Sequence, residues 1–95
     1  MLILKVKEMA KIIKLFTQDE CPKCPPAKEL VSELKKQGFS TKEINVKGNV
    51  DDMSEAAFNQ VLGTPTIIIA DEEDNEVYAW RTKVPSKEEV LKYLE

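Results

Sequence analysis

The sequence predicts an α/β fold, in which a mixed sheet of about four strands is flanked by three helices. One observation is a strand, a helix and a second strand that follow one another within roughly 35 residues, which is the length of a βαβ unit. The other is a strand hairpin near the C-terminus, followed by a last helix. A βαβ unit pairs its strands in parallel and a hairpin pairs them antiparallel, so the sheet is mixed. From Lys11 the predicted order is β-α-β-α-β-β-α.

The first half supplies the βαβ unit. Lys11–Thr17 is a β-branched and aromatic run, which predicts a strand. A helix follows, because apolar residues recur at helical spacing up to a stop at Gly38 (Ala27, Leu30, Val31, Leu34). Phe39–Val46 alternates loosely, with Ile44 and Val46 on one face, and predicts the second strand.

The second half supplies a helix, a hairpin and a final helix. The second helix is expected over Asp52–Leu62, ended by Gly63, with one apolar side turned inward (Met53, Ala56, Ala57, Phe58, Val61). Thr66–Ala70 is a continuously apolar strand of the buried kind. The acidic run Asp71–Asn75 is a turn, after which Val77–Arg81 returns as a strand.

The last helix opens with a capping box, Ser86-Lys87-Glu88-Glu89, and carries Val90, Leu91 and Leu94 inward. At the other end of the chain, residues 1–10 are expected to form either an extra edge strand or a flexible arm. A chain of 95 residues has room for one domain, so residues 1–95 are expected to fold as a single unit.

Composition excludes several classes of function. The sequence contains no His, which removes Ser–His–Asp and Cys–His catalysis and most catalytic zinc chemistry. A net charge of −3 is not expected of a nucleic-acid binder or a membrane-surface protein. Lysines interrupt the opening segment, and no apolar run approaches the ~18 residues of a membrane span. A cytoplasmic protein is expected, in which a pair of cysteines is normally kept reduced.

The chemistry is expected at Cys21-Pro22-Lys23-Cys24, which joins the first strand to the first helix. A Cys-x-x-Cys pair in this context is typical of a redox dithiol. Cys21 lies at the helix start, where free N–H groups and the helix dipole favour a thiolate, and Cys24 lies one turn later on the same face. Lys23 adds to this effect and Asp19 and Glu20 oppose it, which predicts a moderately lowered pKa for Cys21.

Three other interpretations of the two cysteines stay open at this point. They could form a structural disulfide, although a cross-link that closes only a four-residue loop stabilises a fold little. They could share a zinc ion or an iron–sulfur cluster with a second chain, since zinc requires four ligands and this chain offers two thiols. They could also be two unrelated buried cysteines.

A second marker is Gly63-Thr64-Pro65-Thr66, directly before the buried strand. Proline cannot donate to a sheet ladder, so Pro65 is expected at the strand's first residue or at a sheet edge. An X–Pro bond is generally trans, with only ~5–6% cis in folded proteins.

The two segments together carry a resemblance to a known family. Cys21-Pro22-Lys23-Cys24 resembles the C-P-x-C active site of glutaredoxins, and Thr64-Pro65-Thr66-Ile67 resembles the x-P-T segment of thioredoxins. From about Lys11 to Leu94 the chain is similar to the small glutaredoxin-like and thioredoxin-like redoxins of the thioredoxin superfamily.

The resemblance implies a thioredoxin fold and a thiol–disulfide oxidoreductase that acts by mixed-disulfide exchange. Cys21 is then the nucleophile and Cys24 the resolving thiol, with Pro22 and Lys23 tuning the pair. Pro65 is expected to be cis, which puts the backbone of Thr64 beside the sulfurs to bind an extended substrate strand. No cofactor is expected on the chain.

Departures from the family patterns refine the expected partners. Glu20 replaces the tryptophan that precedes the first cysteine of thioredoxins, and Leu15 stands where they carry a buried Asp. Gln18 replaces a Lys of glutaredoxins, and their Gly-Gly-x-x-Asp glutathione segment is absent, so glutathione is not the expected partner.

The resemblance instead implies a monomer that receives electrons from thioredoxin reductase and reduces protein disulfides, with ribonucleotide reductase as one candidate. The alternatives are a metal- or cluster-binding dimer that uses the same cysteines, and a redox-inactive adaptor.

Overall fold

The central feature is a four-stranded mixed sheet in the order β2-β1-β3-β4. The structure is a computed structural model, and it describes residues 11–94. The elements are β1 (Ile12–Thr17), α2 (Cys24–Lys36), β2 (Ser40–Asn45), α3 (Val50–Phe58), β3 (Thr66–Ala70), β4 (Glu76–Arg81) and α4 (Lys87–Leu94). This confirms the predicted order β-α-β-α-β-β-α. The expectation of a strand or arm over residues 1–10 lies outside the described residues.

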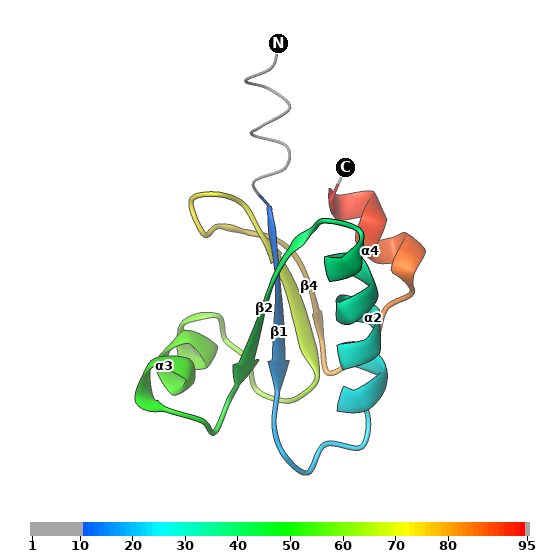
Figure 1. The fold of residues 1–95 in the computed structure, drawn as a ribbon. Coiled ribbons are helices and arrows are strands. Elements are labelled where there is room, and N and C mark those ends of the chain that lie inside the picture. Colours follow the sequence, from blue (N-terminus) through cyan, green and yellow to red (C-terminus); the bar gives the residue numbers. More distant parts are fainter. Residues whose placement is uncertain (1–10, 95) are drawn as a thin grey trace.

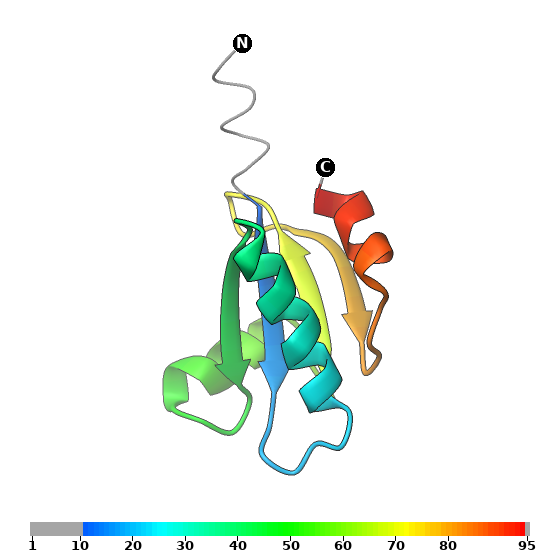
Figure 2. The ribbon, with the colours of Figure 1, turned by 45° about the vertical axis from the view of Figure 1, so that its right-hand side comes forward.

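The strand pairs and the helices form three layers. β1 is parallel to β2 and antiparallel to β3, and β3 is antiparallel to β4, as the βαβ unit and the hairpin predict. α2 and α4 cover one face of the sheet and α3 covers the other (Figures 1 and 2). β3 is buried along its whole length because both of its faces are covered.

The larger core lies between the sheet and helices α2 and α4. It consists of alternate residues of the strands and the inner stripes of the two helices (Ile13, Leu15, Ile67, Ile69, Trp80, Ala27, Val31, Leu34, Val90, Leu94). A smaller core under α3 uses the opposite strand face (Phe16, Ile44, Ile68, Ala56). The start of α2 is therefore held on a sheet that is packed on both sides.

The predicted stop after α2 and the predicted capping box of α4 are both confirmed. Gly38 follows α2 with a φ of 102°, the left-handed conformation that glycine adopts without steric cost. The capping box at α4 is formed: the Glu89 N–H donates to Ser86 Oγ, and the Ser86 N–H donates to Glu89 Oε1, each at 3.2 Å.

The predicted boundaries of α3 are wrong. The helix starts earlier than Asp52, because Asn49 caps it and its Oδ1 accepts a bond from the Asp52 N–H at 2.8 Å. It ends at Phe58, before Gly63, and Gln60 with a φ of 58° turns the chain away. Phe58 and Met53 also do not point inward, since 78% and 52% of their surfaces are exposed. Within the helix only the small Ala56 is buried against the sheet.

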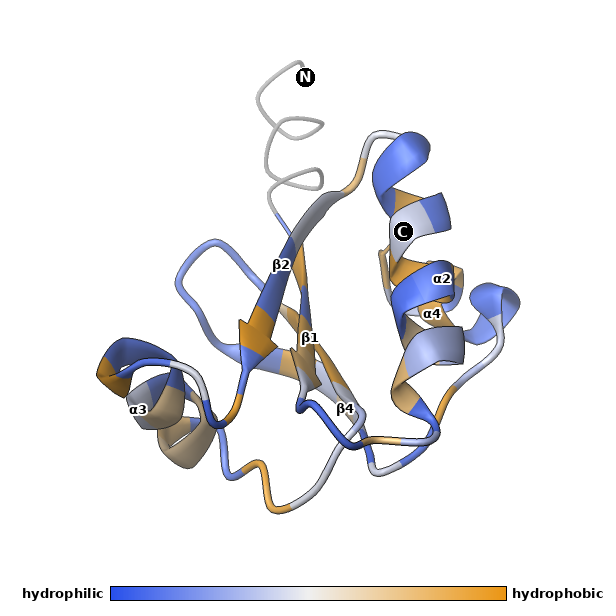
Figure 3. Cartoon of the chain, turned by 60° about the horizontal axis from the view of Figure 1, so that its bottom comes forward, coloured by the Kyte–Doolittle hydropathy of each residue, from blue (hydrophilic) through white to orange (hydrophobic). Residues whose placement is uncertain are grey.

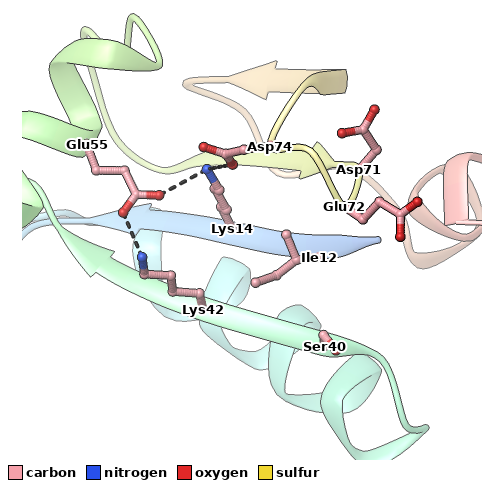
Figure 4. A pocket seen from close by; sticks show the side chains of 8 residues that line it. All are labelled: Ile12, Lys14, Ser40, Lys42, Glu55, Asp71, Glu72 and Asp74. Atoms are coloured by element: carbon pink, nitrogen blue, oxygen red, sulfur yellow. Dashed lines mark hydrogen bonds and ion pairs between the residues drawn. The ribbon is translucent and has the colours of Figure 1, made fainter. Parts of the chain in front are cut away.

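A buried lysine on β1 holds α3 and the β3–β4 turn together. Lys14 faces α3, and its Nζ lies 3.0 Å from Glu55 of α3 and also bonds Asp74 of the turn (Figure 4). Lys42 of β2 donates to the second Glu55 oxygen at 2.7 Å. These groups line an open cleft of about 580 Å³, to which Asp71 and Glu72 add two further carboxylates.

The pKa shifts of the pair show that attraction outweighs burial. Burial by itself lowers the pKa of Lys14, but hydrogen bonds to Asp74 and Glu55 raise it above 10.5. Burial raises the pKa of Glu55, but hydrogen bonds from Lys42 and Lys14 bring it below 4.5. The contribution of Glu55 to stability is therefore present above the unfolded pKa and is lost as the pH falls through the folded pKa.

We predict that Glu55→Gln lowers the free energy of unfolding by about 1–3 kcal/mol at pH 7, because it removes one partner of a buried ammonium. Urea denaturation at several pH values measures this, and the difference from wild type should shrink as the pH falls below 4.5 and through the lowered pKa of Glu55. Glu43→Gln is the matched control, since its 3.5 Å pair with Lys28 is half-exposed and should contribute less than about 1 kcal/mol. Equal losses in the two variants would contradict the role of Glu55.

Candidate active site

The residues predicted to carry the chemistry meet at one end of the sheet. Phe16 of β1 is paired with Thr66 of β3, so the chain leaving β1 and the chain entering β3 lie next to each other. The loop to α2 and the segment between α3 and β3 cross this same end (Figure 3). The register of two buried strands thus brings Cys21 and Thr64, which are far apart in the sequence, to one end of the sheet.

Cys21 and Cys24 are joined by a disulfide, with their Cα atoms 5.3 Å apart. Cys24 is buried, with 2% of its surface exposed, whereas Cys21 is partly exposed. A sulfur of an incoming molecule can therefore approach Cys21 but not Cys24. Such an asymmetric pair is suited to thiol–disulfide exchange.

The local geometry of the pair differs from the expected one. α2 starts at Cys24, with Lys23 as its N-cap residue, and Cys21 lies in the preceding turn. The Cys24 N–H donates to the Cys21 carbonyl oxygen at 3.2 Å and closes that turn. The two cysteines therefore face each other across a turn and are not stacked along one helix face. The prolines at 25 and 26 explain the late start, since proline is tolerated in a first helical turn.

The charged neighbours of the dithiol lie in solvent. Lys23 and Pro22 are exposed, as are Asp19 and Glu20. Asp19 accepts a hydrogen bond from Asn45 Nδ2 at 3.2 Å, which ties the dithiol loop to the end of β2. Lys23 remains the cation nearest in sequence to Cys21.

The segment before β3 is fixed by close packing. The Thr64–Pro65 peptide bond is cis, and Pro65 is fully buried. Thr66 Oγ1 donates to the Gly63 carbonyl at 2.8 Å. A Cβ on Gly63 would lie 2.5 Å from Thr82 Cγ2, so a larger residue here would require the Thr82 side chain to move. Thr64 itself is partly exposed, and its Oγ1 is buried without a hydrogen-bond partner among the described residues.

A mostly apolar groove runs from this segment to α3, and the sequence did not predict it. It holds about 330 Å³ and is lined by side chains from four parts of the chain (Gln18, Val46, Lys47, Met53, Ala56, Ala57, Val61, Leu62, Gly63, Thr64). Leu62 on its rim is 98% exposed. Helical spacing suggested that Met53 and Val61 serve only the core. The one available signal was the apolar pair Val61-Leu62 directly ahead of Gly63-Thr64-Pro65.

Within residues 11–94, no group of three or more Cys, Asp or Glu side chains is placed to hold a metal ion. In the same part of the chain, no helix combines the length and the apolar character that a membrane crossing requires.

The fold, with a Cys-x-x-Cys disulfide ahead of α2, is typical of thioredoxin-like proteins. A family model described as "Thioredoxin domain" matches residues 11–95. The chain belongs to the thioredoxin family, which confirms the resemblance seen in the sequence.

Two archaeal proteins are similar in sequence. A "Probable Thioredoxin" of Archaeoglobus fulgidus is 36% identical over 61 residues, which are 63% of this chain and 66% of that protein. A "Thioredoxin" of Methanocaldococcus jannaschii is 32% identical over 62 residues, 64% of this chain and 73% of that protein. The first alignment thus spans just under two thirds of its relative.

Solved structures agree in fold. A mutant thioredoxin from Halobacterium salinarum superposes with a TM-score of 0.77 at 18% identity, covering 94% of this chain and 75% of that one. Thioredoxin 1 from Thermosipho africanus gives a TM-score of 0.70 at 24% identity, covering 87% and 89%. At these identities the likeness shows the thioredoxin fold alone.

Proposed function

We propose that this protein is a protein-disulfide reductase that passes electrons from the Cys21–Cys24 dithiol to disulfides of other proteins. The observation that carries the proposal is the pairing of a partly exposed sulfur with a buried one ahead of α2. A structural disulfide does not require this asymmetry, whereas two-step exchange does.

The reaction has two steps. The Cys21 thiolate attacks a substrate disulfide, so that a Cys21–substrate bond forms, the substrate S–S bond breaks, and the first substrate sulfur leaves and takes up a proton. Cys24, as a thiolate, then attacks the Cys21 sulfur, which re-forms the Cys21–Cys24 disulfide and releases the second substrate thiol. Two electrons pass from the dithiol to the substrate.

Residues around the pair support these roles. Lys23 favours the Cys21 thiolate by its charge, and Pro22 restricts the turn that brings the sulfurs together. The backbone of Thr64, with Pro65 behind it, binds an extended strand of the substrate by main-chain hydrogen bonds. Leu15, in the larger core, supplies no general base, so Cys24 loses its proton without a buried carboxylate at that position.

The groove between α3 and Thr64 favours a polypeptide over glutathione. Glutathione carries two carboxylates, and Lys47 is the only cation among the groove's lining residues. The remaining lining is mainly apolar and suits the apolar side chains that flank a cysteine in a protein substrate. The groove is continuous with the site, since Gln18 and Thr64 belong to its lining.

Membership of the family supports a proposal for the wider role. The protein acts as a single-domain monomer in the cytoplasm, carries no cofactor, and is recharged by thioredoxin reductase. Its substrates are protein disulfides, with ribonucleotide reductase as one candidate. Support comes from the archaeal relatives, both of which are named thioredoxins, one of them as probable.

We predict that Cys24→Ser traps substrates covalently, because the second step is blocked after the mixed disulfide has formed. Mass spectrometry of the variant after incubation with a disulfide-containing protein such as insulin should show an adduct that dithiothreitol removes. Cys21→Ser is the matched control and should form none, since Cys24 is buried. Equal trapping by the two variants would show that the assigned roles are wrong.

A second prediction concerns the groove. Met53→Gln/Leu62→Gln should lower kcat/KM for insulin reduction about tenfold, because two apolar contacts with the substrate are lost. Reduction of bis(2-hydroxyethyl) disulfide, which is too small to fill the groove, should change less than about twofold. Both residues are more than half exposed, so folding should be preserved.

Phe58→Gln is the control for the groove, because Phe58 is 78% exposed on the same helix but does not line the groove. It should leave both reactions unchanged. An equal loss in Phe58→Gln, or none in the double variant, would rule out the groove as the substrate-binding surface.

A further inference from the structure

We propose that Pro25 and Pro26 make the Cys21–Cys24 pair an electron donor by withholding backbone N–H groups from the Cys21 thiolate. This rests on the proposed function, and it assigns a cause to the direction in which electrons flow. The two prolines are positioning residues, since they act on the sulfur through the backbone of the first turn of α2.

The N–H groups that follow Cys21 are few. Three of the five residues after it are prolines (Pro22, Pro25, Pro26), which have no N–H. Of the other two, Cys24 donates its N–H to the Cys21 carbonyl oxygen at 3.2 Å. Among residues 22–26, the N–H of Lys23 is therefore the one left to face a thiolate at Cys21.

The same prolines weaken the positive end of α2. The partial charge at a helix N-terminus resides on the free N–H groups of its first turn. In α2 that turn begins at Cys24, whose N–H is already bonded, and continues with Pro25 and Pro26. The helix therefore offers Cys21 less stabilisation than its position at a helix start suggests.

Weak stabilisation of the Cys21 thiolate shifts the equilibrium between dithiol and disulfide. Reduction breaks the Cys21–Cys24 bond and takes two electrons from a donor dithiol, which becomes a disulfide. Cys24 takes up a proton, and Cys21 stays as a thiolate or takes up a second proton. Groups that stabilise the thiolate favour the reduced form and make a pair more oxidising. With few such groups, the pair returns to the disulfide readily and gives its electrons to a substrate.

The test restores the missing donors in the full chain with Pro25→Ala/Pro26→Ala, since alanine suits a helical turn. In dithiothreitol redox buffers at a pH well above the Cys21 pKa, where Cys21 is a thiolate, the double variant should favour the reduced form about tenfold more than wild type, the effect of one charge-assisted hydrogen bond. The pH profile of Cys21 alkylation should move down by about one unit, because the same bond acts on the same thiolate.

Pro85→Ala is the control, because it adds an N–H ahead of α4 instead of α2, and it should change neither reading. A redox shift with an unchanged alkylation profile would mean that the variant only loosens the turn, and would overturn the proposal. No redox shift would also overturn it. If wild type does not cycle between dithiol and disulfide at all, the proposed function itself fails, and this is seen before any variant is compared.

Discussion

The site depends on the burial of β1 and β3 between two helical layers. Because both faces of these strands are covered, their register is fixed, and a slip by one residue would turn every buried side chain to the wrong face. The pairing of Phe16 with Thr66 then brings the loop that leaves β1 and the segment that enters β3 to the same edge. The dithiol comes from the first and Thr64 from the second, so their juxtaposition needs no direct bond between the two segments.

The helices determine the exposure of the two sulfurs and provide the groove beside them. α2 buries Cys24 against the larger core and leaves Cys21 in the turn ahead of it, which divides the two sulfurs into an accessible one and a protected one. α3 is attached to the sheet by one small buried residue and by the Glu55 ion pairs, and Met53 and Ala57 are left to line the groove. The helix on one face of the sheet thus sets the exposure of the two sulfurs, and the helix on the other face provides a surface for the substrate.

Most of the architecture could be predicted because its signals are local. The apolar run Thr66–Ala70, the helical spacing after Cys24 and the Ser86–Glu89 capping box each specify one element by short-range chemistry. The two cysteines could be found by spacing alone, and their difference in exposure follows once Cys24 begins a packed helix.

What could not be predicted depends on partners distant in sequence. Lys14 looked like an ordinary member of a strand, and only the approach of Glu55 and Asp74 makes a buried ammonium stable there. The inward face of α3 was misassigned because helical periodicity does not reveal that the sheet has room for Ala56 alone. The groove combines residues from four segments, and the hydrogen bond that uses the Cys24 N–H depends on where α2 starts.

The most direct measurement is the reduction potential of the Cys21–Cys24 pair, determined by equilibration in dithiol buffers and alkylation of the free thiols. A protein-disulfide reductase with a weakly stabilised thiolate should cycle reversibly, with a potential near the roughly −270 mV of thioredoxin. A value near −180 mV or above would contradict the assignment as a reductant and indicate an oxidant or isomerase. A pair that does not cycle reversibly would contradict the enzymatic function altogether.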